Sequence, residues 1–288
     1  MNNLTKKLPV KIYQWDDADA PILDGNKDCV STIFKACLVT GYGSKKSAGW
    51  TLPFEDIDSG IKVFNPPKSA ETDFYLRVSA DDGRQLVPQV FLNMSDIDKG
   101  DLTLQCETEF KYGTGKFNGK WLLIATGRAF WFFTGNKRAN DLPSEHIGSY
   151  FYCGDTIANT IGQRGIYLKY TGGSWNIHDD DRYSIFFKQH GSGAVIGKLY
   201  NPQTNSVADV NPQSLFHGDK NLSTETVASP LYLSAFAELW GLPAVAPSTN
   251  RMKNFEQISD GYRTFINHAH ALIRSETNLY IPIDYWEL

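Results

Sequence analysis

The sequence predicts a mainly β protein of the α+β kind, with antiparallel sheets in a sandwich or barrel-like arrangement and a few short helices. Apolar runs of strand length recur at intervals of roughly ten to fifteen residues beyond Trp50, with turn-forming residues between them. Phe, Tyr and Trp make up 13% of the chain, a share that suits strands. The regular alternation of strands and helices that a parallel sheet requires is not seen.

One helix is predicted near residues 28–40, in the segment KDCVSTIFKACLVTG. Its apolar residues recur at the spacing of one helix face. Asp28 is expected to cap the start of this helix, and Gly41 is expected to end it in a left-handed conformation. The apolar face consists of Val30, Ile33, Phe34, Cys37 and Leu38.

Strands are expected to follow the helix in close succession. They are predicted in IKVFNPP, DFYLRVSADDG, QLVPQVFLNM, DLTLQCETEFKYG, KWLLIATG and RAFWFFTGN, and later in SIFFKQH and AVIGKLY. Within KFNGKW, the pair Asn118-Gly119 is expected to form a hairpin turn. Ordered segments are expected again in SPLYLSAFAELWGLP, YRTFINHAHALIR and NLYIPIDYWEL.

The chain is predicted to have two β-rich parts. Residues 1–155 contain the helix, and residues 156–288 form the second part; the boundary is weakly marked, so a single domain stays open. The polar stretch NPQTNSVADVNPQSLFHGDKNLSTET, at residues 201–226, has no periodicity of its own and is predicted to be a long loop.

The composition argues against several classes of partner. The chain has 28 Lys and Arg against 32 Asp and Glu, a net charge of -4, so no nucleic acid partner is expected. No apolar run reaches the about 18 residues of a membrane-spanning helix, and MNNLTKKLPVKIYQW lacks the apolar run of a signal peptide. The cysteines show no metal-ligand spacing and are expected to be reduced and buried, although a disulfide stays open. They are Cys29, Cys37, Cys106 and Cys153.

The segment VTGYGSKKSAGWTLPFED, which begins at Val39, has the composition of a phosphate-binding loop but not its spacing. That motif requires two glycines five residues apart, with Lys and Ser or Thr directly after the second. Here Gly41 and Gly43 are two residues apart. The segment also follows a predicted helix, whose C-terminal end disfavours an anion. No nucleotide or other cofactor is therefore expected.

Interaction residues are predicted in this segment and in one later segment. The basic turn formed by Lys45 and Lys46 is expected to contact an acidic neighbouring protein. Aromatic residues next to Gly and Pro are candidates for core anchors, the more common role, or for protein–protein contacts. The predicted interaction residues are Lys45, Lys46, Trp50, Pro53, Phe54 and Trp240.

No catalytic or metal-ligating residue is predicted, and the chain is not expected to be an enzyme. The cluster His178–Asp181 suits a solvated turn, because adjacent side chains on an extended chain point to opposite faces. In SDIDKGD, the third ligand position of a calcium loop is Gly100, and Asp101 is out of register. His268 and His270 are two residues apart, which is not the helical histidine pair of a metalloprotease.

Several segments together resemble a family of virion structural or tail proteins of tailed bacteriophages and prophages. They extend from about Lys11 to Leu288, and the chain departs from the family at AELWGLPAVAP, which begins at Ala237 and replaces a basic turn of the form RG-x-LPG. The matching segments are FKACLVTGYGSKKSAGWTLPFED, VFNPP, FYLRVSADDG, FLNMSDIDKGD, KWLLIATGRAFWFFTGN, SYFYCGDTI, LYLSAFAELWGLP and YRTFINHAHALIRSETNLYIPIDYWEL.

The resemblance implies a structural component of the virion, in the tail or baseplate region, that assembles in the host cytoplasm with copies of itself and other virion proteins. It brings no catalytic residues, and contact with a host surface stays open. Two alternatives also stay open: a receptor- or carbohydrate-binding tail-tip module, and a cell-wall hydrolase. Their candidate residues are Trp50, Trp131, Trp175 and Trp240 for sugar stacking, and Asp179–Asp181 or Glu145 as catalytic acids.

Overall fold

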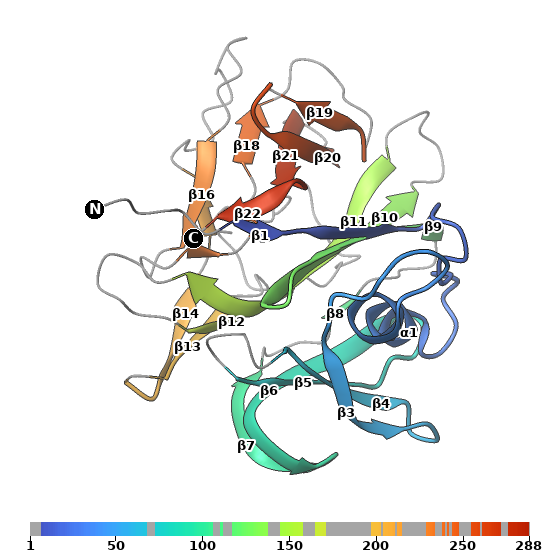
Figure 1. Ribbon diagram of the computed structural model, residues 1–288, viewed down its shortest axis with the longest axis vertical. Helices are drawn as coiled ribbons and strands as arrows, with labels where there is room; N and C mark the ends of the chain where they lie inside the picture. The colour runs from blue at the N-terminus through green and yellow to red at the C-terminus, as the bar shows by residue number, and fades with distance from the viewer. Residues whose placement is uncertain are drawn as a thin grey trace, which may run out of the picture.

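The computed structural model contains several antiparallel sheets and one helical segment among the residues it describes (Figure 1), which confirms the predicted mainly β class. The described residues are 7–67, 73–105, 110–111, 117–137, 145–157, 165–170, 197–202, 204–210, 212–214, 229–233, 238–239, 241, 244–247, 255–259, 261–271 and 276–287.

The largest sheet has eight strands and crosses the middle of Figure 1. The strand order is β14-β13-β12-β11-β10-β9-β2, and β17 pairs with the far end of β11. The strands are β2 (Lys11–Gln14), β9 (Phe117–Ala125), β10 (Ala129–Lys137), β11 (Glu145–Ile157), β12 (Ile166–Tyr170), β13 (Gly197–Asn201), β14 (Ser206–Val210) and β17 (Glu238–Leu239).

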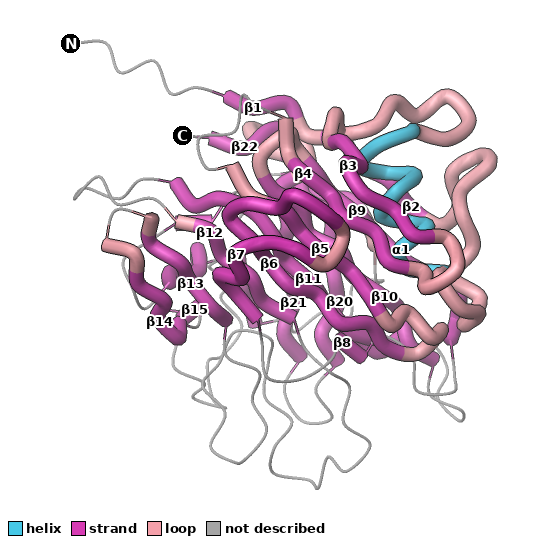
Figure 2. The backbone as a smooth tube through the Cα atoms, turned by 90° about the horizontal axis from the view of Figure 1, so that it is seen from below, coloured by secondary structure: helices cyan, strands magenta, loops and turns pink. Residues whose placement is uncertain are grey.

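The second sheet is a meander in which each strand pairs with the next, in the order β3-β4-β5-β6-β7, and a short β8 also pairs with β6. In Figure 2 it lies in front of β9, β10 and β11, and the two sheets share one hydrophobic core. The strands are β3 (Thr51–Asp56), β4 (Ile61–Asn65), β5 (Tyr75–Ser79), β6 (Gln85–Asp96), β7 (Lys99–Gln105) and β8 (Phe110–Lys111).

The third sheet lies at the top of Figure 1 and has the order β15-β16-β18-β21-β20-β19. A separate two-stranded sheet joins β1, which directly precedes β2, to β22, which follows β21. The strands are β15 (Pro212–Ser214), β16 (Ser229–Leu233), β18 (Ala244–Pro247), β19 (Gln257–Ser259), β20 (Thr264–Ala271), β21 (Glu276–Pro282), β1 (Lys7–Pro9) and β22 (Tyr285–Glu287).

The predicted helix near residues 28–40 is confirmed as a turn of α-helix, α1 (Cys29–Phe34), that continues as a π-helix, η1 (Lys35–Thr40). Gly41 ends it, as expected, with a positive φ of 78°. Its ψ of 174° is extended, however, so the predicted left-handed cap is wrong in detail. The N–H of Gly41 donates to the carbonyl of Ala36 at 2.7 Å, the five-residue spacing of a π-helix.

The predicted cap at the start of the helix is also corrected. Asp28 occupies the cap position, but its side chain makes no capping hydrogen bond. Its Oδ1 atom instead lies 3.8 Å from the Nζ atom of the buried Lys62. The capping oxygen comes from Asp81, whose Oδ2 atom accepts a hydrogen bond from the backbone N–H of Ser31 at 2.8 Å.

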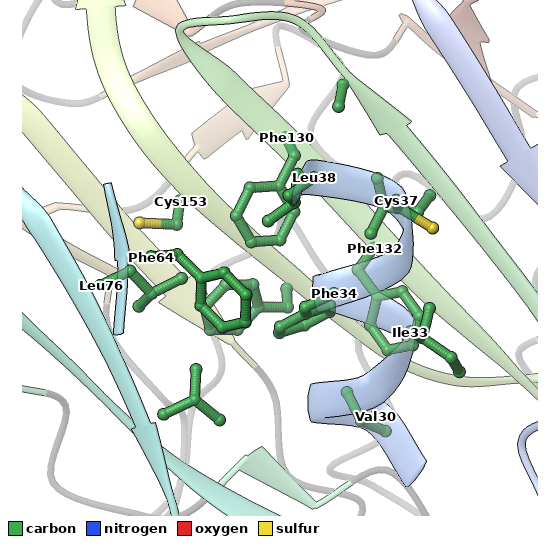
Figure 3. Close-up of a cluster of buried hydrophobic side chains, with 14 of the residues drawn as sticks. Val30, Ile33, Phe34, Cys37, Leu38, Phe64, Leu76, Phe130, Phe132 and Cys153 are labelled. Atoms are coloured by element: carbon green, nitrogen blue, oxygen red, sulfur yellow. The ribbon is translucent and has the colours of Figure 1, made fainter. Parts of the chain in front are cut away.

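The core lies between the first two sheets, and Phe34 of α1 contacts rings from both (Figure 3). Its ring centroid is 6.3 Å from that of Phe64 in β4, 5.2 Å from Phe130 and 5.0 Å from Phe132 in β10. Burying one such side chain stabilises a fold by about 1.5–3 kcal/mol. The apolar face of the helix, which the sequence predicted, therefore packs against both sheets.

Three further expectations are located by the structure. The boundary expected between residues 155 and 156 falls inside β11, whose strand partners lie on both sides of that position in the chain. The expected loop at residues 201–226 contains β14 and β15 in its first half, and residues 215–228 lie outside the described residues. Asn118-Gly119 is not a hairpin turn but lies within β9.

The cysteine prediction is confirmed for three of the four residues. Cys29, Cys37 and Cys153 are buried, and none of these three is in a disulfide. Cys106 lies outside the described residues.

Candidate interaction site

Backbone N–H groups of the glycine-rich segment after η1 donate hydrogen bonds to the helix that precedes it. Ala48 N–H donates to the carbonyl of Cys37 at 2.8 Å, and the N–H groups of Gly49 and Trp50 donate to the carbonyl of Leu38 at 3.1 and 2.9 Å. The last carbonyls of a helix have no partner within the helix, so the returning chain satisfies them. These N–H groups are therefore not available to a phosphate.

Two of the three glycines of this segment, Gly41 and Gly43, are required by close backbone contacts. A Cβ atom on Gly41 would lie 2.4 Å from the carbonyl oxygen of Lys45, and one on Gly43 would lie 2.6 Å from that of Ala18. Both residues also have a positive φ, which side chains disfavour. Tight packing of the chain on itself thus explains the glycines without a ligand.

Lys45 is bound by its own chain. Its Nζ atom lies 2.9 Å from Oδ1 of Asp17 and donates to the carbonyl of Ile12 at 3.0 Å. Ile12 belongs to β2, the edge strand of the eight-stranded sheet. An exposed strand edge invites pairing with another chain, and a lysine across it is a common protection. Lys45 thus has an intramolecular role at the position where a contact with an acidic neighbour was expected.

Two more contacts hold the same segment against β2. The hydroxyl of Tyr13 donates to the carbonyl of Lys46 at 2.8 Å, and the Nζ atom of Lys11 donates to the carbonyl of Ser47. Lys46 contributes only its backbone to these contacts, and its side chain is exposed. Residues 42–47 therefore form a cover over the free edge of β2.

A half-buried acid, Asp17, anchors this cover. Asp17 accepts a hydrogen bond from the hydroxyl of Tyr42 at 2.7 Å and another from the backbone N–H of Gln14 at 2.9 Å. Burial, and then the hydrogen bond to Asp17, raise the pKa of Tyr42, and burial raises the pKa of Tyr13 and of the Cys37 thiol. Both tyrosines therefore stay protonated and act as hydrogen-bond donors.

The tryptophans that the structure describes among the sugar-stacking candidates are core residues. Trp50 is buried, and its Nε1 atom donates to the carbonyl of Thr126 at 2.9 Å. Trp131 is fully buried beside Tyr152. A buried indole has no free face for a sugar ring, so Trp50 and Trp131 act as anchors.

Phe54 lies on the side of the second sheet that faces away from the main core. Pro53 is exposed, and the half-buried Phe54 packs on a small hydrophobic group that we name the outer cluster. The outer cluster consists of Val63, Phe91 and Met94, which are buried, with Phe54, Tyr75 and Ile97 packed around them.

The hairpin of β6 and β7 curls back over this outer cluster. Its ladder shifts register at three places, beginning between Val90 and Phe91, and such bulges bend a strand. Ile97, at the tip, is eight residues beyond Gln89, so a straight strand would place the two residues about 26 Å apart. Arg77 lies opposite Gln89 and also binds the carbonyl of Ile97, so the hairpin must fold back over the sheet. Figure 1 shows the resulting curl at the lower end of the molecule.

Arg77 of β5 holds the tip in place. Its Nε atom donates to the carbonyl of Ile97 at 3.0 Å, and its Nη2 atom lies 2.5 Å from Oδ1 of Asp98. The remaining donor, Nη1, binds Ser79 and Gln89 on the same face of the sheet. The guanidinium group thus links two strands of the meander to the turn that covers them.

The acids of the segment SDIDKGD point to different partners. Asp98 pairs with Arg77, Asp96 pairs with Lys99 at 3.7 Å, and Oδ2 of Asp101 lies 3.5 Å from Asn93. No group of three or more His, Cys, Asp or Glu side chains that could hold a metal ion occurs in the described part of the chain.

Several candidates lie wholly or partly outside the described residues. Trp240, Trp175 and residues 178–181 are not described. His268 and His270 lie in β20, and Glu145 begins β11, but the structure describes only their backbone.

Sequence reasoning missed Arg77, Ile97 and Asp98. The alternation in FYLRVS placed Arg77 on the face opposite Leu76 and Val78, and that was the available signal. The position of the hairpin tip over that face had no sequence signal, because it depends on bulges that only the paired strands reveal.

Comparisons of this chain with protein-family models, with curated proteins and with solved structures gave no match. Among the described residues, no helix has both the length and the apolar character needed to cross a membrane.

Proposed function

We propose that this chain is a structural component of a tailed-bacteriophage virion, in the tail or baseplate region, and that it acts by assembling with copies of itself and with other virion proteins. The observation that carries the proposal is the role of the segments that resemble the virion family. GYGSKKSAGW covers a strand edge, FYLRVSADDG supplies Arg77 and the helix cap Asp81, and FLNMSDIDKGD forms the curled hairpin.

These segments use their polar groups to fix the fold, which suits a protein whose work is mechanical. Assembly into a virion requires rigid subunits with surfaces that repeat from copy to copy. Two hairpins of the second sheet, β3–β4 and β6–β7, also carry exposed apolar side chains, Ile57 at 81% and Leu102 at 50%. Such residues supply contact area when a neighbour packs against a projecting hairpin.

The test is the protein content of purified particles. Mass spectrometry of virions, purified by density gradient from an induced host, is expected to detect this chain at a fixed ratio to the major tail protein. An antibody raised against the chain is expected to label one region of the tail in electron micrographs. Absence of the chain from infectious particles would contradict the proposal.

A further inference from the structure

The outer face of the second sheet already binds a peptide turn, and that turn belongs to the same chain. The occupant is the tip of the β6–β7 hairpin, residues 96–99, which places an apolar residue and an acid on the face. The face therefore has a known ligand chemistry: a tight β-turn with an aliphatic side chain followed by a carboxylate.

The tip contacts the face in two ways, through an apolar side chain and through a carboxylate. Ile97 packs on Val63, Phe91 and Met94, and its carbonyl accepts a hydrogen bond from Arg77. The carboxylate of Asp98 meets the same guanidinium group. The apolar contact and the charged contact are adjacent, so a turn must present both to bind.

We propose that this face is a self-assembly site that receives the Ile97–Asp98 tip of a second copy of the chain, with the contacts made within one molecule replaced by the same contacts between two. The inference rests on the proposed assembly of copies and names the surface that they use. Exchange of an identical element between protomers creates no new contact and so requires no new complementarity.

Two conditions favour exchange of the tip. The register shifts between Phe91 and Met94, and again between Met94 and Asp96, break the regular ladder at the base of the tip and allow it to bend. The Asp98 carboxylate is 66% exposed and its ion pair contributes little, so the contacts to be exchanged are mainly those of Ile97 with the outer cluster and with Arg77. When many copies are held side by side, high local concentration favours the intermolecular contact.

The first experiment removes, in the full-length chain, the two side chains that occupy the face and supplies the tip as a peptide. The variant Ile97→Gly with Asp98→Gly, which we call the vacated variant, keeps turn-compatible residues but lacks both recognised groups. The probe is a fluorescent peptide of residues 93–101, closed by a disulfide between added terminal cysteines, and fluorescence anisotropy measures its binding. A peptide with Ile97→Ser and Asp98→Asn is the matched control.

The probe is expected to bind the vacated variant at least about tenfold more tightly than the unsubstituted chain, whose own tip competes. Adding Arg77→Ala to the vacated variant is expected to abolish this binding. Equal affinity for the two chains, equal affinity for the two peptides, or no binding at millimolar peptide would each overturn the proposal. Circular dichroism and thermal melting establish that the variants are folded.

A second measurement uses whole chains. The vacated variant carrying Ser79→Cys is mixed with a chain carrying Lys99→Cys, which keeps both Ile97 and Asp98; Lys99 directly follows Asp98, and Asp98 and Ser79 both contact Arg77. A disulfide-linked heterodimer is expected to form several-fold faster than when Ser79→Cys is placed in a chain with an intact tip. Equal rates would count against exchange. Failure here would leave the presence of the chain in virions unaffected, so the two proposals fail separately.

Discussion

The backbone N–H of Ser31 donates a hydrogen bond to the carboxylate of Asp81, fifty residues further along the chain, over 2.8 Å. The backbone carbonyl of Asp81 also accepts a hydrogen bond from the N–H of Asp28 at 2.9 Å. The turn after β5 thus caps the helix that lies between the two sheets. Because Asp81 is only 2% exposed, this bond is shielded from water.

Replacing Asp81 with Ala is expected to lower the free energy of unfolding by about 1–2 kcal/mol, because the first turn of the helix loses its only side-chain cap among the described contacts. Asp81→Asn keeps an acceptor oxygen and is expected to lose less. Urea denaturation followed by fluorescence measures both. Asp58→Ala, at an exposed position in the β3–β4 turn, is the control; an equal loss there would contradict the capping role.

The buried ion pair of Arg128 and Asp155 is expected to be sensitive to removal of either partner. Arg128 donates to Oδ2 of Asp155 from Nε at 2.9 Å and from Nη2 at 2.6 Å, and both side chains are nearly inaccessible. Asp155→Ala is expected to lower the free energy of unfolding by about 3–5 kcal/mol, since it removes the carboxylate that pairs with a buried guanidinium group. The double variant with Arg128→Met should lose less than the sum of the single variants. Additive losses in this double-mutant cycle would show that the two groups act independently.

Lys45 and Lys46 are expected to respond differently to substitution. Lys45→Ala removes the contacts with Asp17 and with the carbonyl of Ile12, and a loss of about 1 kcal/mol is expected for this partly exposed group. Lys46→Ala removes an exposed side chain and is expected to leave the melting temperature unchanged. If the two variants melt at the same temperature, the cover over β2 contributes nothing measurable.

Alkaline pH is expected to destabilise the fold partly through Tyr42. Burial, followed by the hydrogen bond to Asp17, raises the pKa of Tyr42 in the folded state, whereas the pKa of an unfolded tyrosine is about 10. Above that pH the unfolded state releases a proton that the folded state retains, so stability is fully present below about pH 10 and falls as the pH rises.

Tyr42→Phe removes this contribution. It is expected to be less stable than the unsubstituted chain at neutral pH, because the hydrogen bond to Asp17 is lost, and to lose stability less steeply between about pH 9.5 and 11. Urea denaturation at several pH values measures both slopes. Parallel curves would mean that Tyr42 does not titrate differently in the two states.

Local patterns in the sequence predicted the elements whose causes are local. The helix near residues 28–40 follows from the spacing of its apolar face, and the strands of the meander follow from alternation of buried and outward side chains. The N–H groups of Gly49 and Trp50, which a phosphate loop would turn toward its anion, bind the carbonyl of Leu38.

Features that depend on distant partners could not be predicted in this way. Asp28 had the residue type of a cap, but the bond is made by Asp81, whose nearness to the helix is a property of the folded chain. Asn118-Gly119 had the composition of a turn, yet it lies where β9 has three residues between the partners of Thr134 and Asn136. The pairing of β9 with β10 keeps Asn118-Gly119 within a strand despite its preference for a turn.

The candidate site was predicted in part. Phe54 does border the outer cluster, whereas Trp50 lies in the core and Lys45 is bound by its own chain. Composition marked aromatic and basic residues as suitable for contacts, but it could not tell a contact with a neighbour from a contact within the chain. Burial makes that distinction, and it depends on the whole fold.

The pairing of β1 with β22 determines how the molecule would respond to a pulling force. Lys7 lies opposite Glu287, with Leu8 opposite Trp286 and Pro9 opposite Tyr285. A load applied across Lys7 and Glu287 would open this ladder like a zipper, one residue pair after another, before it reached either large sheet. Tension would therefore separate the three residue pairs of β1 and β22 first, while the aromatic core around Phe34 remained unstrained.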